Sequence, residues 1–367
     1  MRNASTTNCR PVKDVRKDSG VYTSAPMFGY ESAHENGFGF QLSLKRKTQH
    51  DDAERICCHS GRSHILTCGS TGSGKTNLAI ANSLSYRGSL IVVDVRGDIA
   101  LTTARFRREV LGHETHVLDP FNVTGLPRAR LDPLDVIRLP GTSPDTEAQS
   151  IAATLASRVR SERDPFWHEH GSSTNGSVIS HLLSQDDPAK RSFPRLLDIL
   201  FSDDAVYQLA VMMDTEVKKQ TFAYEGIGAF LQLPDGQGNT RGCVLATVHA
   251  MLHAFRCQAV RESMQSSTID LVGLLEGKPM TIYLVLPVER MESHGIVLRL
   301  WLDTLLQVLI RRVRPPAIPT MVMVDEAAQL GPCPALKTVA TYLRASGVRL
   351  WTFWQDLSQL KSLYSDW

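Results

Sequence analysis

The stretch His64–Thr76 of this 367-residue chain reads HILTCGSTGSGKT. Its last eight residues, Gly69–Thr76, match the phosphate-binding pattern G-x-x-x-x-G-K-[ST] at every position. Ile65–Thr67 is a short apolar, β-branched run before the glycines, and Thr76–Ala81 begins a helix-favouring run after them. The stretch therefore predicts a strand, a loop and a helix that together bind a nucleoside triphosphate.

The composition of this loop suits a polyphosphate. Its glycines remove side chains so that phosphates can approach the backbone, and successive N–H groups then point into one concavity at a helix N-terminus. Lys75 would reach the β- and γ-phosphates, and the Thr76 hydroxyl would ligate Mg²⁺. A chance Gly/Ser loop before an ordinary helix is the alternative. The predicted cofactor-binding residues are Gly69, Ser70, Thr71, Gly72, Ser73, Gly74, Lys75 and Thr76.

A second apolar run, Thr320–Val324, leads directly into Asp325 and Glu326. We expect this strand to lie beside the strand that leads into the loop, so that both carboxylates come near the γ-phosphate. Asp325 would orient Mg²⁺ through its waters, and Glu326 would polarise the attacking water. Acid pairs at strand ends also occur without catalytic meaning, so the interpretation depends on the loop. A loop first and an acid strand much later favour the RecA-like group.

Two further polar residues end predicted strands. Gln355 ends the run Val348–Gln355, where it can contact the γ-phosphate and report its loss, or can be a solvated strand end. Asp94 ends Leu90–Asp94 and could reach the same crevice at the carboxyl edge of the sheet, or could form a turn before Gly97. The predicted catalytic residues are Glu326, Lys75 and Gln355, and the predicted metal ligands are Thr76 and Asp325.

The remaining sequence predicts an α/β fold with a mostly parallel sheet. Short apolar runs alternate with helical patterns, which is typical of βαβ units. From about Thr142 helical spacing takes over, and no convincing strand returns before the run Met280–Pro287. The predicted parts are a disordered tail at 1–25, a P-loop nucleotide-binding domain at 26–142 and 266–367, and an inserted all-α domain at 143–265.

The charge balance neither supports nor excludes a nucleic-acid partner. Lys+Arg number 40 and Asp+Glu number 38, which gives a net charge of +2, so any DNA contact would use local patches. A solvated helix face is the commoner reason for each basic residue, but several are candidate DNA contacts. These are Arg105, Arg107, Arg108, Lys218, Lys219, Arg311, Arg312 and Arg314.

Seven cysteines, an odd number without a C-x-x-C pair, indicate a reducing compartment rather than a disulfide framework. Cys57-Cys58-His59 with His64 and Cys68 might suggest a metal site, but adjacent cysteines rarely bind one ion, so partly buried thiols are the preferred interpretation.

Neither a signal peptide nor a membrane span is expected. Met1–Asp18 is polar and charged, without an apolar stretch. The most hydrophobic helix candidate, Gly295–Val313, carries Arg299, Asp303 and Gln307 at intervals, so it is read as a buried helix with one polar edge.

With these residues assembled, the chain resembles the TraG/TraD group of type IV secretion coupling proteins, relatives of the FtsK and HerA DNA-pumping ATPases. The resemblance runs from about Gly37 to the end. Beyond the loop and the acid pair, it rests on an ordered set of shorter segments that is more specific than either. These are Asp94–Asp98 (with Val95 where the family has proline), His116–Phe121, Asp132–Leu134, Phe166–Trp167, Leu330–Gly331 and Gln355–Leu360.

The resemblance implies an ATP- and Mg²⁺-dependent P-loop ATPase that forms a homo-hexameric ring. It would move DNA, single-stranded or relaxase-bound, toward a secretion channel during conjugation, with channel components at the inner membrane as partners. The expected location is cytoplasmic, peripheral at the cytoplasmic face of the inner membrane. Family members usually begin with membrane-spanning helices and continue past the glutamine segment. Two alternatives therefore stay open: a truncated nucleotide-binding module without motor activity, and another RecA-like secretion or pilus ATPase.

Overall fold

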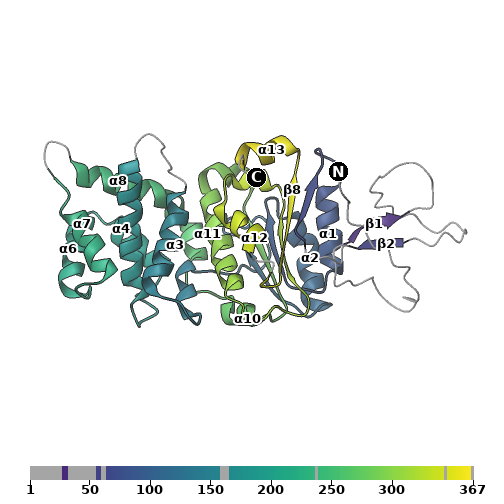
Figure 1. Ribbon diagram of the computed structural model, residues 1–367, viewed down its shortest axis with the longest axis horizontal. Helices are drawn as coiled ribbons and strands as arrows, with labels where there is room; N and C mark the ends of the chain where they lie inside the picture. Colours follow the sequence, from purple (N-terminus) through teal and green to yellow (C-terminus); the bar gives the residue numbers. More distant parts are fainter. Residues whose placement is uncertain are drawn as a thin grey trace, which may run out of the picture.

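The computed structural model shows a sheet with its covering helices beside a region made of helices alone (Figure 1). It describes residues 27–31, 55–58, 63–157, 165–235, 239–342 and 345–364. Two short strands, β1 (Met27–Glu31) and β2 (Arg55–Cys58), pair antiparallel in a small separate sheet. The predicted tail 1–25 lies outside the described residues, as do the side chains of Cys57, Cys58 and His59.

The large sheet has six strands, all parallel, in the order β3-β8-β7-β4-β6-β5. Parallel neighbours require crossover connections, which the helices between the strands provide. Four of the strands, β4, β6, β7 and β8, are buried along their whole length because helices cover both faces. The strands are β3 (Ile65–Cys68), β4 (Leu90–Asp94), β5 (Glu114–Leu118), β6 (Met280–Val285), β7 (Thr320–Val324) and β8 (Val348–Trp354).

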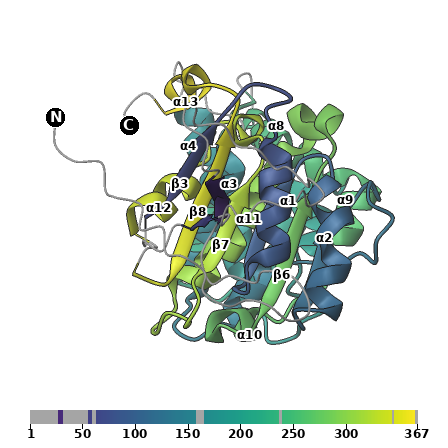
Figure 2. The ribbon, with the colours of Figure 1, turned by 90° about the vertical axis from the view of Figure 1, so that its right-hand side faces the viewer.

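Alternate residues of a strand pack against different helices. Leu90 and Val92 belong to the core shared with α1 (Lys75–Ser85) and α2 (Asp98–Glu109), which Figure 2 shows in front of the sheet. Ile91 and Val93 belong to the core on the other face, shared with α11 (Met291–Ile310). Shorter helices complete this part: α10 (Leu271–Glu276), η3 (Val288–Arg290), η4 (Ala327–Leu330), α12 (Pro334–Tyr342) and α13 (Leu357–Leu363).

Helix α11 (Met291–Ile310) is the long apolar helix expected near Gly295–Val313. By length and composition it could cross a membrane, but 67% of its most apolar window is buried inside the protein. Trp301, at its middle, is fully buried and donates from Nε1 to the Leu131 carbonyl at 3.0 Å. The burial confirms the interpretation of this segment as a buried helix.

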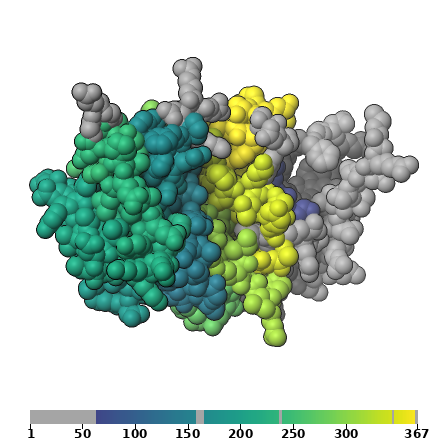
Figure 3. All heavy atoms as spheres, turned by 60° about the vertical axis from the view of Figure 1, so that its left-hand side comes forward, coloured from purple at the N-terminus to yellow at the C-terminus, as the bar shows by residue number. Residues whose placement is uncertain are grey.

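Between residues 143 and 265 every described element is a helix, and Figure 3 brings this region forward. Its core is continuous with the core on the α11 face of the sheet. The limits 143–265 of an inserted domain stay a prediction. The helices that follow β5 in the chain are η1 (Pro133–Arg138), α3 (Pro144–Ala156), α4 (Pro165–Leu183), α5 (Phe193–Leu200), α6 (Ala205–Thr215), α7 (Phe222–Leu231), α8 (Thr240–Leu252), η2 (His253–Arg256) and α9 (Gln258–Ser263).

Two of the candidate DNA contacts, Arg107 and Arg312, are buried. Arg107 donates to the carbonyls of Ser83, Tyr86 and Gly88 at 2.7 Å each, and thereby ties α2 to the end of α1. Arg312 donates to the Thr320 hydroxyl and the Leu274 carbonyl. Burial lowers the pKa of each guanidinium to about 10. Both readings from sequence, a DNA contact and a solvated face, are wrong for these two residues.

His113 lies beside Arg107 and makes folding stability depend on pH. Arg107 Nη2 lies 3.0 Å from His113 Nδ1, so Nδ1 must accept, while Nε2 donates to the Arg87 carbonyl at 3.1 Å. Burial, and then the neighbouring guanidinium, lower the pKa of His113 from 6.5 to about 4. Between these values the unfolded chain binds more protons than the folded chain, so this residue makes stability fall as the pH falls.

We expect the variant His113→Gln to lose less stability than the wild type between about pH 7 and about pH 5. A glutamine can accept from Arg107 and donate to the Arg87 carbonyl without titrating. Urea unfolding at both pH values measures the change. The remaining titratable groups affect both proteins alike. If the free energy of unfolding depends equally on pH in the two proteins, the assignment to His113 is wrong.

Candidate nucleotide-binding site

The predicted phosphate loop joins β3 to α1 at the carboxyl edge of the sheet. Gly74 is the N-cap of α1 with φ 89°, and Gly72 has φ 79°, a region of backbone conformation that favours glycine. Gly69 N donates to the Trp354 carbonyl at 3.0 Å, which fixes the start of the loop on β8. A Cβ on Gly69 would lie 2.6 Å from Ser73 Oγ. Gly72 and Gly74 therefore serve the backbone shape of the loop, and Gly69 leaves room for the Ser73 side chain, at a helix N-terminus of the kind that binds anions.

Lys75, in the first turn of α1, folds back onto the loop. Its side chain is 8% exposed, and Nζ donates to the carbonyls of Gly69 at 2.6 Å and Ser70 at 3.0 Å. The ammonium group is thus held inside the loop by two carbonyl oxygens. A bound phosphate would compete with those oxygens for the same charge.

The acid strand does not lie beside the loop strand. β3 pairs with β8, and β8 pairs with β7, so one strand separates them. The prediction that they are neighbours is wrong, because strand order in a parallel sheet depends on the crossover connections and not on the pattern within a strand. Side chains from the two segments still meet in spite of the strand between them, because Thr76 Oγ1 lies 3.5 Å from Asp325 Oδ2.

Asp325 offers an unused oxygen beside Thr76. The residue is 4% exposed, and within the described part of the chain its Oδ1 has no hydrogen-bond partner. Burial, and then the neighbouring charge of Glu326, raise the pKa of Asp325 to about 6. A carboxylate oxygen without a partner next to a hydroxyl is a set of oxygen ligands that suits Mg²⁺.

Glu326 and Gln355 come from adjacent strand ends and contact each other. Gln355 Nε2 donates to Glu326 Oε2 at 3.1 Å. Glu326 has φ 50°, a left-handed conformation that is uncommon for a residue with a side chain and often marks a functional site. The sequence predicted both residues at the γ-phosphate, but it did not indicate a bond between them.

Residues after Gln355 fix its position, and sequence analysis did not assign them this role. Gln355 N donates to Gln359 Oε1 at 3.1 Å, and Gln359 N donates to Asp356 Oδ1 at 2.9 Å. Asp356 is the N-cap of α13. An Asp followed three residues later by Gln is close to a capping-box pattern, which is the signal that could have predicted this arrangement.

Both carboxylate oxygens of Asp94 accept hydrogen bonds from the segment that follows it. Its carboxylate accepts from Gly97 N at 2.9 Å and from Ala100 N at 2.8 Å, and so holds the turn that leads into α2. Burial raises its pKa to about 6. Of the two readings left open for Asp94, the structure favours the turn-forming one.

Comparisons with known proteins find relatives along most of the chain. The family described as Type IV secretory system Conjugative DNA transfer matches residues 33–366. The conjugal transfer protein TraG of Escherichia coli is 25% identical over 321 residues, which are 83% of this chain and 50% of TraG. The type IV secretion system-coupling protein VirD4 of Bartonella henselae is 20% identical over 311 residues, 83% of this chain and 48% of VirD4. The chain spans about half the length of these curated relatives.

Solved structures of the plasmid coupling protein TrwB share the fold. TrwB in complex with the non-hydrolysable ATP analogue ADPNP has a TM-score of 0.60 at 18% identity, over 83% of this chain and 66% of TrwB. TrwB with ADP and Mg²⁺ has a TM-score of 0.58 at 17% identity over the same shares. Together with the parallel sheet, this similarity confirms the predicted α/β, RecA-like P-loop fold class.

Proposed function

Because the chain belongs to the type IV secretory system conjugative DNA transfer family, we propose that it hydrolyses ATP to drive DNA translocation as a coupling protein. The observation that carries the proposal is the meeting of Thr76 and Asp325 at one sheet edge, beside a phosphate loop and a Glu326–Gln355 pair. The names of TraG and VirD4 support the role in transfer. The TrwB complexes support ATP and Mg²⁺ as cofactors.

In this proposal the loop Gly69–Thr76 binds the phosphates of ATP. Backbone N–H groups at the start of α1 donate to them, and Lys75 leaves the carbonyls of Gly69 and Ser70 for the β- and γ-phosphates. Thr76 and Asp325 would hold Mg²⁺, which would neutralise charge on the β- and γ-phosphates. Asp325 Oδ1, which has no hydrogen-bond partner among the described residues, is the observation that favours this ligand.

Glu326 is the proposed general base. It would take a proton from the attacking water, and Gln355 keeps one of its carboxylate oxygens in place. Gln355 is also tied to the start of α13 through Gln359. We therefore propose that Gln355 both orients Glu326 and passes the loss of the γ-phosphate to α13.

The finer parts of the proposal concern assembly and location. We propose a homo-hexameric ring, single-stranded or relaxase-bound DNA as cargo, and type IV secretion channel components at the inner membrane as partners. The proposed location is cytoplasmic, peripheral at the cytoplasmic face of that membrane. The names of TraG and VirD4 support a secretion system as the partner, and the other points extend the resemblance to coupling proteins.

The test is ATP hydrolysis by the purified chain with Mg²⁺, with and without single-stranded DNA. We expect turnover that DNA stimulates, and a hexamer in analytical ultracentrifugation with nucleotide and DNA present. If the chain binds ATP but shows no turnover either with or without DNA, that result would contradict the motor function and would favour a nucleotide-binding module.

A further inference from the structure

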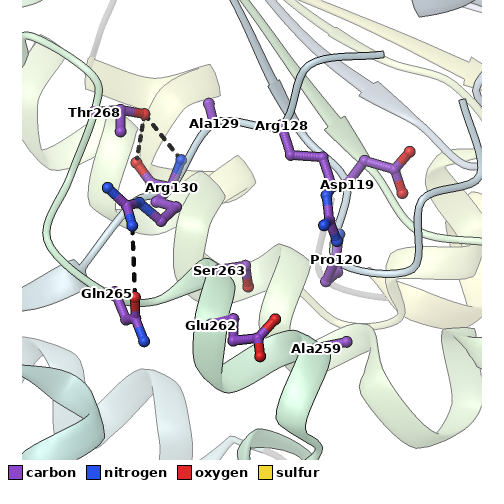
Figure 4. A pocket seen from close by; sticks show the side chains of 10 residues that line it. All are labelled: Asp119, Pro120, Arg128, Ala129, Arg130, Ala259, Glu262, Ser263, Gln265 and Thr268. Atoms are coloured by element: carbon purple, nitrogen blue, oxygen red, sulfur yellow. Dashed lines mark hydrogen bonds between the residues drawn. The ribbon is translucent and has the colours of Figure 1, made fainter. Parts of the chain in front are cut away.

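A pocket of about 350 Å³ opens between α9 and the chain that follows β5 (Figure 4). β5 lies at the opposite end of the sheet from β3, so the pocket is separate from the phosphate loop although it lies toward the same carboxyl edge. Small residues line part of it. The larger lining residues are Asp119, Pro120, Arg128, Arg130, Glu262 and Gln265.

The backbone that carries the two arginines is held on both sides. Ala129 N donates to the Val117 carbonyl of β5 at 2.8 Å. On the other side, Thr268 N donates to the Arg130 carbonyl at 3.0 Å, and Arg130 N donates to Thr268 Oγ1 at 3.0 Å. Both arginines are exposed, so their charged groups extend into solvent from a fixed base.

Neither guanidinium is neutralised by a carboxylate within the described part of the chain. Arg130 Nη1 reaches only the amide oxygen of Gln265, at 3.5 Å, and no ion pair there involves Arg128. Asp119, the buried carboxylate nearby, accepts instead from the backbone and hydroxyl of Thr124 at 2.8 and 2.9 Å. Each guanidinium therefore keeps a charge that an anionic group could pair, although Asp119 and Glu262 balance the charge of the lining as a whole.

Glu262 limits which anion can bind. It lines the pocket from α9 and accepts from Gln258 Nε2 at 2.8 Å, so it would repel a compact anion at the centre. In Figure 4, Arg128 runs beside Pro120 on one side, and Arg130 turns toward Gln265 on the other. A ligand with separated anionic groups, one for each arginine, fits this arrangement better than a single ion.

We propose that this pocket binds the phosphodiester backbone of a DNA strand, with Arg128 and Arg130 on successive phosphates. Guanidinium groups bind phosphate oxygens in a two-pronged geometry, and such contacts dominate affinity for DNA without reading its sequence. The inference rests on the proposed function for the choice of DNA over an acidic protein segment, and it deepens that function by assigning a DNA contact. DNA held there would touch both the segment that follows β5 and α9 of the helical region.

The test is binding of a fluorescent oligothymidylate to the full chain, followed by anisotropy at several salt concentrations. The double variant Arg128→Gln/Arg130→Gln should bind roughly tenfold more weakly, and the slope of log affinity against log salt should shrink by about 1.4, because two phosphate contacts are lost. Glu262→Gln should bind more tightly than the wild type, because it removes the repelling charge.

The matched control is Lys190→Gln/Arg195→Gln. These two residues are exposed in the helical region, outside the pocket and outside the sequence-based DNA candidates, and their replacement changes the net charge by the same amount. We expect the control to bind like the wild type. An equal loss in both double variants would show a general charge effect and would overturn the assignment of the pocket.

Failure of the pocket and failure of the proposed function give different results. If DNA stimulates ATP turnover of the wild type but Arg128→Gln/Arg130→Gln binds the oligonucleotide normally, the pocket assignment alone is wrong. If the wild type neither binds the oligonucleotide nor responds to it, the DNA function itself is wrong. Binding of polyglutamate in place of the oligonucleotide, lost in the double variant, would assign the pocket to an acidic protein segment and overturn the inference.

Discussion

Replacing Lys75 with alanine is expected to lower ATP turnover by a factor of about 100 or more, because a positioned charge at the transferring phosphate is lost. In the structure this ammonium group lies within the loop, on the carbonyls of Gly69 and Ser70. Alanine keeps the helix start and leaves the backbone N–H groups in place. Nucleotide affinity should fall as well, since in the proposed mechanism Lys75 would contact the phosphates both before and during the reaction.

The measurement is steady-state turnover with and without DNA, beside titration with a fluorescent ADP analogue. Lys337→Ala serves as the control, because it removes an exposed lysine from α12. Thermal unfolding of both variants checks that the loop has not collapsed after losing two hydrogen bonds. Turnover by Lys75→Ala close to that of the wild type would show that the loop does not serve catalysis.

Replacing Glu326 with glutamine should separate binding from chemistry. The amide has nearly the shape of the carboxylate and can still pair with Gln355, but it cannot take a proton from water. Loss of a general base typically lowers turnover by about 10²–10⁴-fold. We therefore expect turnover to fall by about that factor while affinity for the ADP analogue stays near the wild-type value.

The control for this variant is Glu289→Gln, in the exposed turn η3 at the end of β6. Its turnover should equal that of the wild type. Unchanged turnover in Glu326→Gln would remove Glu326 from the role of base. A parallel loss of nucleotide affinity would point instead to a disturbed loop, because Glu326 adjoins Asp325 and its own backbone is left-handed.

Local patterns in the sequence predicted the elements that hold the site. The glycines at 69, 72 and 74 and the acid-ended strand are signals within a few residues, so the loop, α1 and the end of β7 could be read directly. The α/β class followed from alternating short strands and helices. Helical spacing likewise indicated that strands stop between 143 and 265.

Features that depend on distant segments could not be read in this way. The position of β8 between β3 and β7 depends on the path of the crossover connections, and the residues within a strand carry no signal for that path. Arg107 looked like a surface residue because its carbonyl partners come from the turn after α1, outside its own helix. Arg128 and Arg130 carry no motif, and only the packing of α9 against their segment makes them a pair.

The uninterrupted core between the sheet and the helices has a mechanical meaning. Val324 of β7, Leu305 of α11 and Leu155 of α3 belong to one apolar cluster that extends to α6 and α8. Moving the helical region away from the sheet as a separate domain would expose the side chains of this cluster to water. A displacement that begins at the ends of β7 and β8 would therefore be transmitted to the helical region through packed side chains. A flexible connection between two separate cores would absorb it instead.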